Sequence, residues 1–162
     1  MPTRAPKSPK SCHERALGLL AVRPRSRREL ERRLLQAGFQ PEEVFDVIGR
    51  LERVGLIDDE AFARQVAQHQ FGVRRAGARA VAGALAAKGV ARSTVDAVLA
   101  DAPNDEETRA DELARSRAHR LAGVDPAKAF GRLSSFLMRR GYGPEVARLA
   151  ARRALDLQRS ED

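Results

Sequence analysis

The chain has 162 residues, of which 43% are hydrophobic but only 4% are aromatic, and its formal net charge is +8. No stretch approaches the ~18 consecutive apolar residues of a membrane span, and a single cysteine, Cys12, excludes a disulfide framework. The apolar residues are mostly Ala, Leu and Val, which favours packed helices over sheets. Arg greatly outnumbers Lys, which favours partners that carry phosphates or carboxylates.

The first eleven residues differ from the rest in composition. They contain three Pro and three basic residues and almost nothing to bury, which predicts a disordered, positively charged arm over residues 1–11. This arm does not run into an apolar segment, as a secretory signal would. We therefore expect a cytoplasmic protein.

A helix pair is predicted directly after residue 25. Ser26 and Glu29 have the spacing of a capping box, in which the hydroxyl of one residue and the carboxylate of the other accept from each other's backbone N–H groups. Gly38 supplies a left-handed stop, and Pro41 suits the first position of the next helix. The apolar residues of that second helix are Val44, Phe45, Val47, Ile48 and Leu51.

This pattern recurs twice along the chain. A shift of 51 residues aligns the apolar positions and stop glycine of the first pair with Val81, Leu85, Gly89, Val90, Val95 and Leu99. A further shift of 52 aligns part of this set with Leu133, Leu137, Gly141 and Tyr142. The apolar stripe, the stop glycine and the apolar residue after it coincide in all three copies. This coincidence indicates an internal repeat.

Another helical segment precedes each pair, over about residues 13–22, 59–70 and 105–121. The sequence therefore predicts an all-α fold built from three tandem three-helix units with helix-turn-helix-like pairs. The units are expected over residues 12–70, 59–101 and 104–158. The segment 59–70 opens the second unit and forms its junction with the first.

Several stretches of this repeat match one family. They are residues 16–20 leading into 23–30, residues 34–39, the run Gly55-Leu56-Ile57-Asp58-Asp59-Glu60-Ala61-Phe62-Ala63, and residues 85–90. They resemble the RecX family, bacterial regulatory proteins that act on the RecA recombinase. The likeness covers about residues 12–157 and is specific in the first two copies and loose in the third. It implies an elongated, curved array of nine helices.

The resemblance also implies a function. Such an array would dock along the groove of a RecA–DNA filament and inhibit its growth, its ATP hydrolysis or strand exchange. That would give the chain a role in homologous recombination, DNA repair and the SOS response.

Basic residues concentrate in three places, each on a helix pair or in the loop before it. The candidate binding residues are Arg23, Arg25, Arg27, Arg28 and Arg32 in the first cluster, Arg74, Arg75, Arg79, Lys88 and Arg92 in the second, and Arg139 and Arg140 in the third. A solvated surface is the ordinary explanation for a single Arg pair. However, no acidic residue occurs between Ala61 and Val95, although 32% of the chain is charged. For this stretch we favour binding to a phosphate backbone or an acidic protein groove.

A sequence-reading helix-turn-helix is disfavoured. The first pair has the required shape, but its second helix opens Pro41-Glu42-Glu43 and would be repelled by phosphates. The equivalent helix of the middle copy begins Arg92-Ser93-Thr94 and is more permissive. Three copies with different surfaces fit a regulator that docks on a composite surface better than a dimeric operator binder.

No pattern predicts catalysis, a cofactor or a metal. Asp58 and Asp59 could form a magnesium or paired-carboxylate site, but a helix start capped by one Asp is the favoured interpretation, and the same holds for residues 104–107. No phosphate-binding glycine loop is present. The phenylalanines are expected mostly in the core. Metal-ligand or nucleophile spacing is lacking around Cys12, His13, His69 and His119.

The sequence thus predicts a monomeric, non-enzymatic regulator whose partners are a RecA filament and single- or double-stranded DNA. Two alternatives stay open. One is a general, non-sequence-specific DNA-binding or architectural protein that does not contact RecA. The other, less favoured, is a transcriptional regulator that reads DNA with one helix pair.

Overall fold

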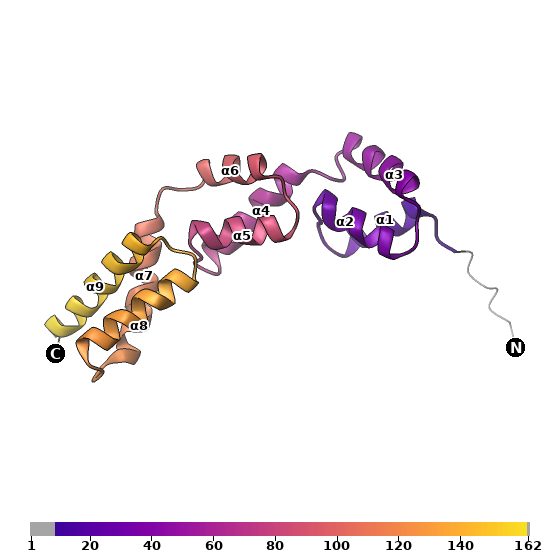
Figure 1. The fold of residues 1–162 in the computed structure, drawn as a ribbon. Coiled ribbons are helices and arrows are strands. Elements are labelled where there is room, and N and C mark those ends of the chain that lie inside the picture. Colours follow the sequence, from indigo (N-terminus) through magenta and orange to yellow (C-terminus); the bar gives the residue numbers. More distant parts are fainter. Residues whose placement is uncertain (1–8, 162) are drawn as a thin grey trace, which may run out of the picture. The chain divides into compact units, whose positions relative to one another are not determined.

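A computed structural model describes residues 9–161 of the chain, with side chains up to Asp156. The described residues form helices and no strand, so the all-α prediction is confirmed. Most of the predicted basic arm, residues 1–8, lies outside them. The helices are α1 (Cys12–Val22), α2 (Arg27–Gln36), α3 (Pro41–Arg53), α4 (Asp59–Gly72), α5 (Ala78–Ala87), α6 (Arg92–Ala100), α7 (Glu106–Ala118), the 3-10 helix η1 (His119–Leu121), α8 (Pro126–Arg139) and α9 (Pro144–Glu161) (Figure 1).

The tertiary contacts divide the chain into two compact units, which we call unit 1 and unit 2. Unit 1 runs to Phe62 and includes the short segment Lys88–Val90. Unit 2 comprises residues 63–87 and the chain from Ala91 onward. No helix among the described residues is long and apolar enough to cross a membrane.

The core of unit 1 is a cluster from the first three helices. Its buried side chains recur at helical spacing, so each helix turns one apolar stripe inward. They are Cys12, Ala16, Leu30, Leu34, Val44, Val47, Ile48 and Leu51, and Ile57 joins them from the loop after α3. Phe45, predicted to belong to this stripe, is 68% exposed. It follows Val44 directly, and one step along a helix turns a side chain by about 100°.

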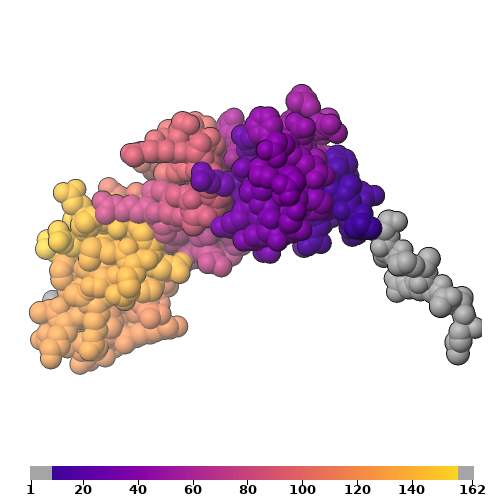
Figure 2. Space-filling model, turned by 45° about the vertical axis from the view of Figure 1, so that its right-hand side comes forward, coloured from indigo at the N-terminus to yellow at the C-terminus, as the bar shows by residue number. Residues whose placement is uncertain are grey.

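In unit 2, a large cluster of buried side chains lies where α7, α8 and α9 pack side by side (Figures 1 and 2). The faces that meet there consist largely of alanine, and short side chains let helix axes approach closely. Larger residues fill the remaining space. The buried members are Ala110, Ala114, Ala118, Leu133, Leu137, Tyr142, Ala147, Ala150, Ala151 and Ala154.

Helix starts are capped largely by the side chains that the sequence indicates. Ser26 and Glu29 form the capping box at the start of α2. One carboxylate oxygen of Asp58 accepts from the N–H groups of Glu60 and Ala61, at 3.1 and 3.0 Å. The start of α7 differs from the expectation, because Asp105 occupies the N-cap position but its side chain makes no capping hydrogen bond. Instead it forms an ion pair with Arg109 one turn later.

Candidate binding site

In both units a loop from later in the chain lies against the start of a helix, and the predicted basic residues gather there. In unit 1 the hydroxyl of Ser26, which caps α2, donates to the carbonyl of Lys88. In unit 2 the N–H of Gly77, just before α5, donates to the carbonyl of Arg140 at 2.9 Å. We call these contacts junction 1 (residues 23–29, 59 and 88–89) and junction 2 (residues 74–80, 106 and 139–142). They are equivalent, because Gly77 follows Ser26 by 51 residues and Arg140 follows Lys88 by 52.

The equivalence extends to the first N–H of each helix. The N–H of Arg27 donates to the carboxylate of Asp59 at 2.7 Å, and the N–H of Ala78 donates to that of Glu106 at 3.0 Å. Each carboxylate comes from the first residue of a later helix, α4 or α7. A helix start leaves such N–H groups without an intrahelical partner. In both repeats, therefore, the first N–H group of the helix donates a hydrogen bond to a carboxylate from a later helix.

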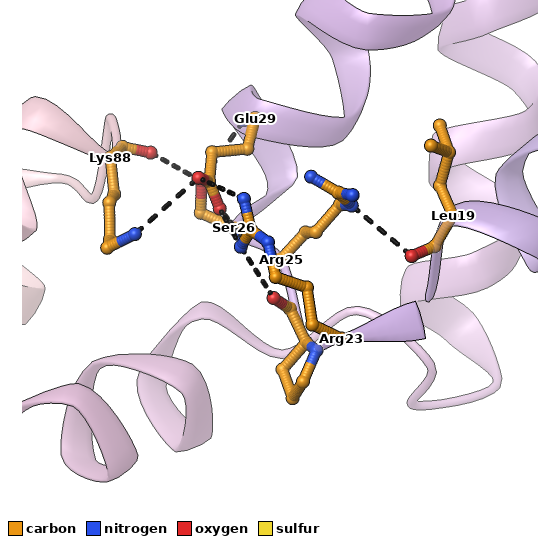
Figure 3. Close-up of polar contacts among 7 residues, drawn as sticks. Leu19, Arg23, Arg25, Ser26, Glu29 and Lys88 are labelled. Atoms are coloured by element: carbon orange, nitrogen blue, oxygen red, sulfur yellow. Dashed lines mark hydrogen bonds and ion pairs between the residues drawn. The ribbon is translucent and has the colours of Figure 1, made fainter. Parts of the chain in front are cut away.

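Junction 1 is centred on Glu29, which is only 7% exposed (Figure 3). Its carboxylate lies 3.1 Å from Nη2 of Arg23 and 3.6 Å from Nζ of Lys88, and accepts from the N–H of Ser26 at 3.2 Å. Burial raises the pKa of Glu29, but these hydrogen bonds and the two positive charges outweigh it and hold that pKa below its ordinary value. Glu29 therefore stays charged and neutralises part of the cluster.

Other arginines of the first cluster also serve the fold. Arg25 is 9% exposed and donates through Nε to the carbonyl of Leu19 at 3.3 Å. Burial lowers its pKa, and the charges of Arg23 and Arg33 lower it further. Arg27 lies 3.4 Å from the carboxylate of Glu52. These contacts are intramolecular, and each engages the Nε atom of its arginine.

Arg28 and Arg32 are exposed, as Arg23 also is. Neither forms an ion pair with an acid in the part of the chain that the structure describes. The side chain of Arg28 covers Gly89, where an added Cβ would clash with it. Of the first cluster, these two guanidinium groups are the ones left open to a partner.

Junction 2 brings together two clusters that lie about 65 residues apart in the sequence. The N–H of Arg79 donates to the carbonyl of Gly141 at 3.2 Å, and the hydroxyl of Tyr142 donates to the carbonyl of Arg75 at 2.6 Å. Arg75 has a φ of +47°, a left-handed conformation that is uncommon outside glycine. The bond from Tyr142 holds this loop in place. The arginines gathered here are Arg74, Arg75, Arg79, Arg139 and Arg140.

This arginine cluster of junction 2 has no counterpart of Glu29. The equivalent position, 51 residues later, is Ala80. The carboxylate of Glu106 is nearby but accepts from the N–H of Ala78. None of the five arginines forms an ion pair among the described residues, and all except the half-buried Arg140 are exposed. Junction 2 is thus the less neutralised of the two.

The remaining candidates of the second cluster lie elsewhere. Lys88 belongs to junction 1. Arg92 stands at the start of α6, with a side chain 95% exposed and 3.8 Å from the carboxylate of Asp96. The structure therefore does not gather the second cluster as a group.

Two features were missed by the sequence reasoning. Arg109 is only 9% exposed, and the Cζ atom of its guanidinium lies 4.5 Å from the ring centroid of Phe71. Its position in an acid-rich segment gave no signal of burial. The second feature is a row of basic residues along α8, in which Lys128 and Arg132 were not among the predicted residues. A search at helical spacing could have found them.

The aromatic rings and histidines near the basic residues are not arranged for base stacking or metal binding in the part of the chain that the structure describes. Phe71 and Tyr142 are 8% and 1% exposed, so neither presents a ring face for base stacking. The three histidines are exposed. Within the described residues no group of three or more potential ligand side chains is placed to hold a metal ion.

Comparison with known proteins identifies the family. The chain matches models of the first, second and third three-helix domains of RecX, over residues 12–51, 58–99 and 105–150. It belongs to the RecX family. The prediction of three tandem three-helix units is thereby confirmed.

Relatives support this over most of the chain. A regulatory protein RecX from Mycolicibacterium smegmatis is 40% identical over 136 residues, which are 81% of this chain and 72% of that protein. One from Streptomyces coelicolor is 37% identical over 143 residues, or 86% of this chain and 75% of the relative. Both relatives are named as regulatory proteins.

Crystal structures of RecX proteins share the fold. The structure of RecX from Lactobacillus salivarius superimposes with a TM-score of 0.80 at 20% identity and covers 90% of this chain and 95% of its own. A second RecX crystal structure gives 0.73 at 22% identity, covering 83% of this chain and 67% of that chain. At such low identity the likeness concerns the RecX fold alone.

Proposed function

We propose that this RecX-family chain regulates RecA by binding a RecA–DNA filament, where it inhibits filament growth, ATP hydrolysis and strand exchange without catalysing a reaction itself. Family membership supports the regulatory role. The observation that carries the binding mode is the arginine cluster of junction 2, five guanidinium groups without an ion-pair partner among the described residues. Planar guanidinium groups bind phosphates and carboxylates in a forked geometry, and a nucleoprotein filament offers both.

The candidate residues then have two roles. Arg74, Arg75, Arg79, Arg139 and Arg140 are proposed as the principal contacts, and Arg28, Arg32 and Arg92 as additional ones. Arg23, Arg25, Arg27 and Lys88 act through the fold, because their polar groups contact Glu29, Leu19 or Glu52.

The setting proposed for this activity follows from the sequence. The chain would act as a cytoplasmic monomer, in recombination, DNA repair and the SOS response. Its three-helix units would span residues 12–70, 59–101 and 104–158, preceded by the basic arm.

A second candidate is a general DNA-binding protein that does not contact RecA. The same cluster favours it, because a phosphate backbone alone could bind these five guanidinium groups, four of them on exposed residues. The two functions differ in stoichiometry. A protein that blocks growing filament ends acts at a small fraction of the RecA concentration, whereas one that coats DNA must approach saturation of the lattice.

The test follows ATP hydrolysis by the cognate RecA on single-stranded DNA while the protein is titrated in. Strong inhibition well below one molecule per RecA monomer, not relieved by excess DNA, is the expected result. Inhibition only at concentrations that cover the DNA would replace the proposal with the general DNA-binding function.

A further inference from the structure

The exposed face of α8 carries a straight row of cations. Lys128, Arg132 and Arg139 follow one another at four and seven residues. At about 100° per residue, their directions fall within roughly 40° of one another around the helix axis. At about 1.5 Å per residue, they are spaced along the axis by roughly 6 and 10.5 Å. We call these three residues the α8 row.

No negative charge offsets this row within its own segment. The nineteen residues from Pro126 to Pro144 include no Asp or Glu. None of the three cations forms an ion pair among the described residues of the chain. The nearest acid in the sequence, Asp125, accepts from the N–H of Lys128 at 3.0 Å and so caps the helix. The α8 row therefore keeps its charge available to an external partner.

The row borders a shallow hollow of about 460 Å³. Its lining consists of the three cations with Gly131 and Ser135 between them. An added Cβ at Gly131 would meet no atom within 4 Å, so the floor of the hollow is open. The opposite face of α8 is buried through Ala129, Leu133 and Leu137, which fixes the orientation of the row.

We propose that the α8 row is a binding site for the phosphate backbone of a nucleic acid strand. A polyanion supplies repeated charges along a line, roughly one phosphate per 3.4 Å of rise in each strand. A protein partner would need apolar anchors, because interface energy concentrates in buried aromatic and aliphatic contacts. The hollow offers no apolar side chain to such an anchor. Charge and shape therefore favour the backbone of nucleic acid over an acidic protein.

This inference deepens the proposed function and rests on it in one respect, namely that DNA is present where the chain acts. It assigns the α8 row to DNA itself, and it adds Lys128 and Arg132 to the contact residues.

The test measures binding to a fluorescent single-stranded oligonucleotide by anisotropy over a salt series. The variant is Lys128→Gln with Arg132→Gln, which leaves junction 2 and Arg139 intact. Loss of two phosphate contacts makes the slope of log K against log salt shallower by about 1.4. If the two lines converge near ~1 M salt, the Kd at ~0.1 M rises roughly 25-fold. The control, Arg50→Gln with Arg53→Gln on α3, removes the same charge from another exposed surface and is expected to change binding little.

A second pair of variants separates binding from folding. Gly131→Glu and Gly131→Gln add side chains of equal size to the open floor of the hollow. Both remove a helix-interior glycine and should not lower stability. Weaker binding is expected for the glutamate and not for the glutamine.

Equal DNA binding by the Lys128/Arg132 variant and its control would overturn the inference. So would DNA binding like that of the unsubstituted protein combined with lost inhibition of RecA, since the row would then contact protein. If the row variant loses DNA binding while the unsubstituted protein fails to inhibit RecA, the proposed function fails and the α8 site stands.

Discussion

Glu29 and Ala80 occupy equivalent positions in consecutive repeats and give the two junctions different charge. Glu29 accepts from Arg23 and Ser26 and pairs with Lys88, so the cations around it are tied to the fold. At Ala80 no carboxylate is available, and the surrounding arginines keep their charge. The presence of a carboxylate at Glu29 and its absence at Ala80 therefore explain why the cations of junction 1 stabilise the fold, whereas those of junction 2 are candidates for binding.

Replacing Glu29 with Gln is expected to lower the free energy of unfolding by about 1–3 kcal/mol at neutral pH, because it removes charge-assisted hydrogen bonds at a nearly buried site. The folded-state pKa of Glu29 lies below its ordinary value of 4.5. Its contribution is thus present above pH 4.5 and is lost as pH falls through the folded pKa. Urea unfolding at several pH values measures this. A difference that persists unchanged at strongly acidic pH would contradict it, and exposed Glu31→Gln is the matched control.

The converse substitution, Ala80→Glu, is expected to weaken binding to the RecA filament. It places a carboxylate among the arginines of junction 2 at the position that Glu29 occupies in junction 1. Because an opposite charge nearby competes with phosphate, the protein concentration that half-inhibits RecA should rise several-fold. Ala80→Gln has the same size without the charge and should leave inhibition near its original level. Equal effects of both variants would indicate a steric cause.

At the scale of elements, junction 2 depends on the close approach of two backbone segments. Gly77 lies so close to Gly141 that an added Cβ would overlap its carbonyl carbon and oxygen. Gly141 has a φ of +94°, and its own added Cβ would overlap Ala80. The stop glycine Gly141 therefore has two functions. It ends α8 in a left-handed conformation, and its lack of a side chain lets α5 pack against it.

Gly77→Ala is expected to destabilise unit 2 by roughly 1–3 kcal/mol or more, since the clash is with backbone and no flexible side chain can yield. Gly83→Ala in the interior of α5 is the control. Nothing lies within 4 Å of its added Cβ, and helix propensity predicts a gain of about 0.5–1 kcal/mol. Thermal unfolding compares them. A Gly77 variant as stable as the Gly83 variant would mean that junction 2 does not contribute to stability.

For the molecule as a whole, the net charge of +8 and the open arginines predict salt-dependent binding. If the five arginines of junction 2 contact phosphates of single-stranded DNA in the filament, affinity should fall roughly 100-fold between ~50 and ~200 mM salt. Anisotropy of labelled filaments over this range measures the slope. A flat response would count against contacts to phosphates, and Gln at all five positions should make the slope shallower.

The sequence by itself determined the helices, their stops and the threefold repeat, because 3–4 spacing, capping residues and stop glycines are local signals that act within one turn. It did not reveal that Phe45 is exposed, since a single helical step separates a buried position from a solvated one.

Only the tertiary structure decided which basic residues are free. Arg23 and Lys88 look like Arg74 and Arg140 in the sequence, but the first two meet at a buried Glu29 and the latter two lie on opposite sides of a junction without one. Pairing of charges depends on segments about 60 residues apart meeting in space, and local sequence does not encode that proximity.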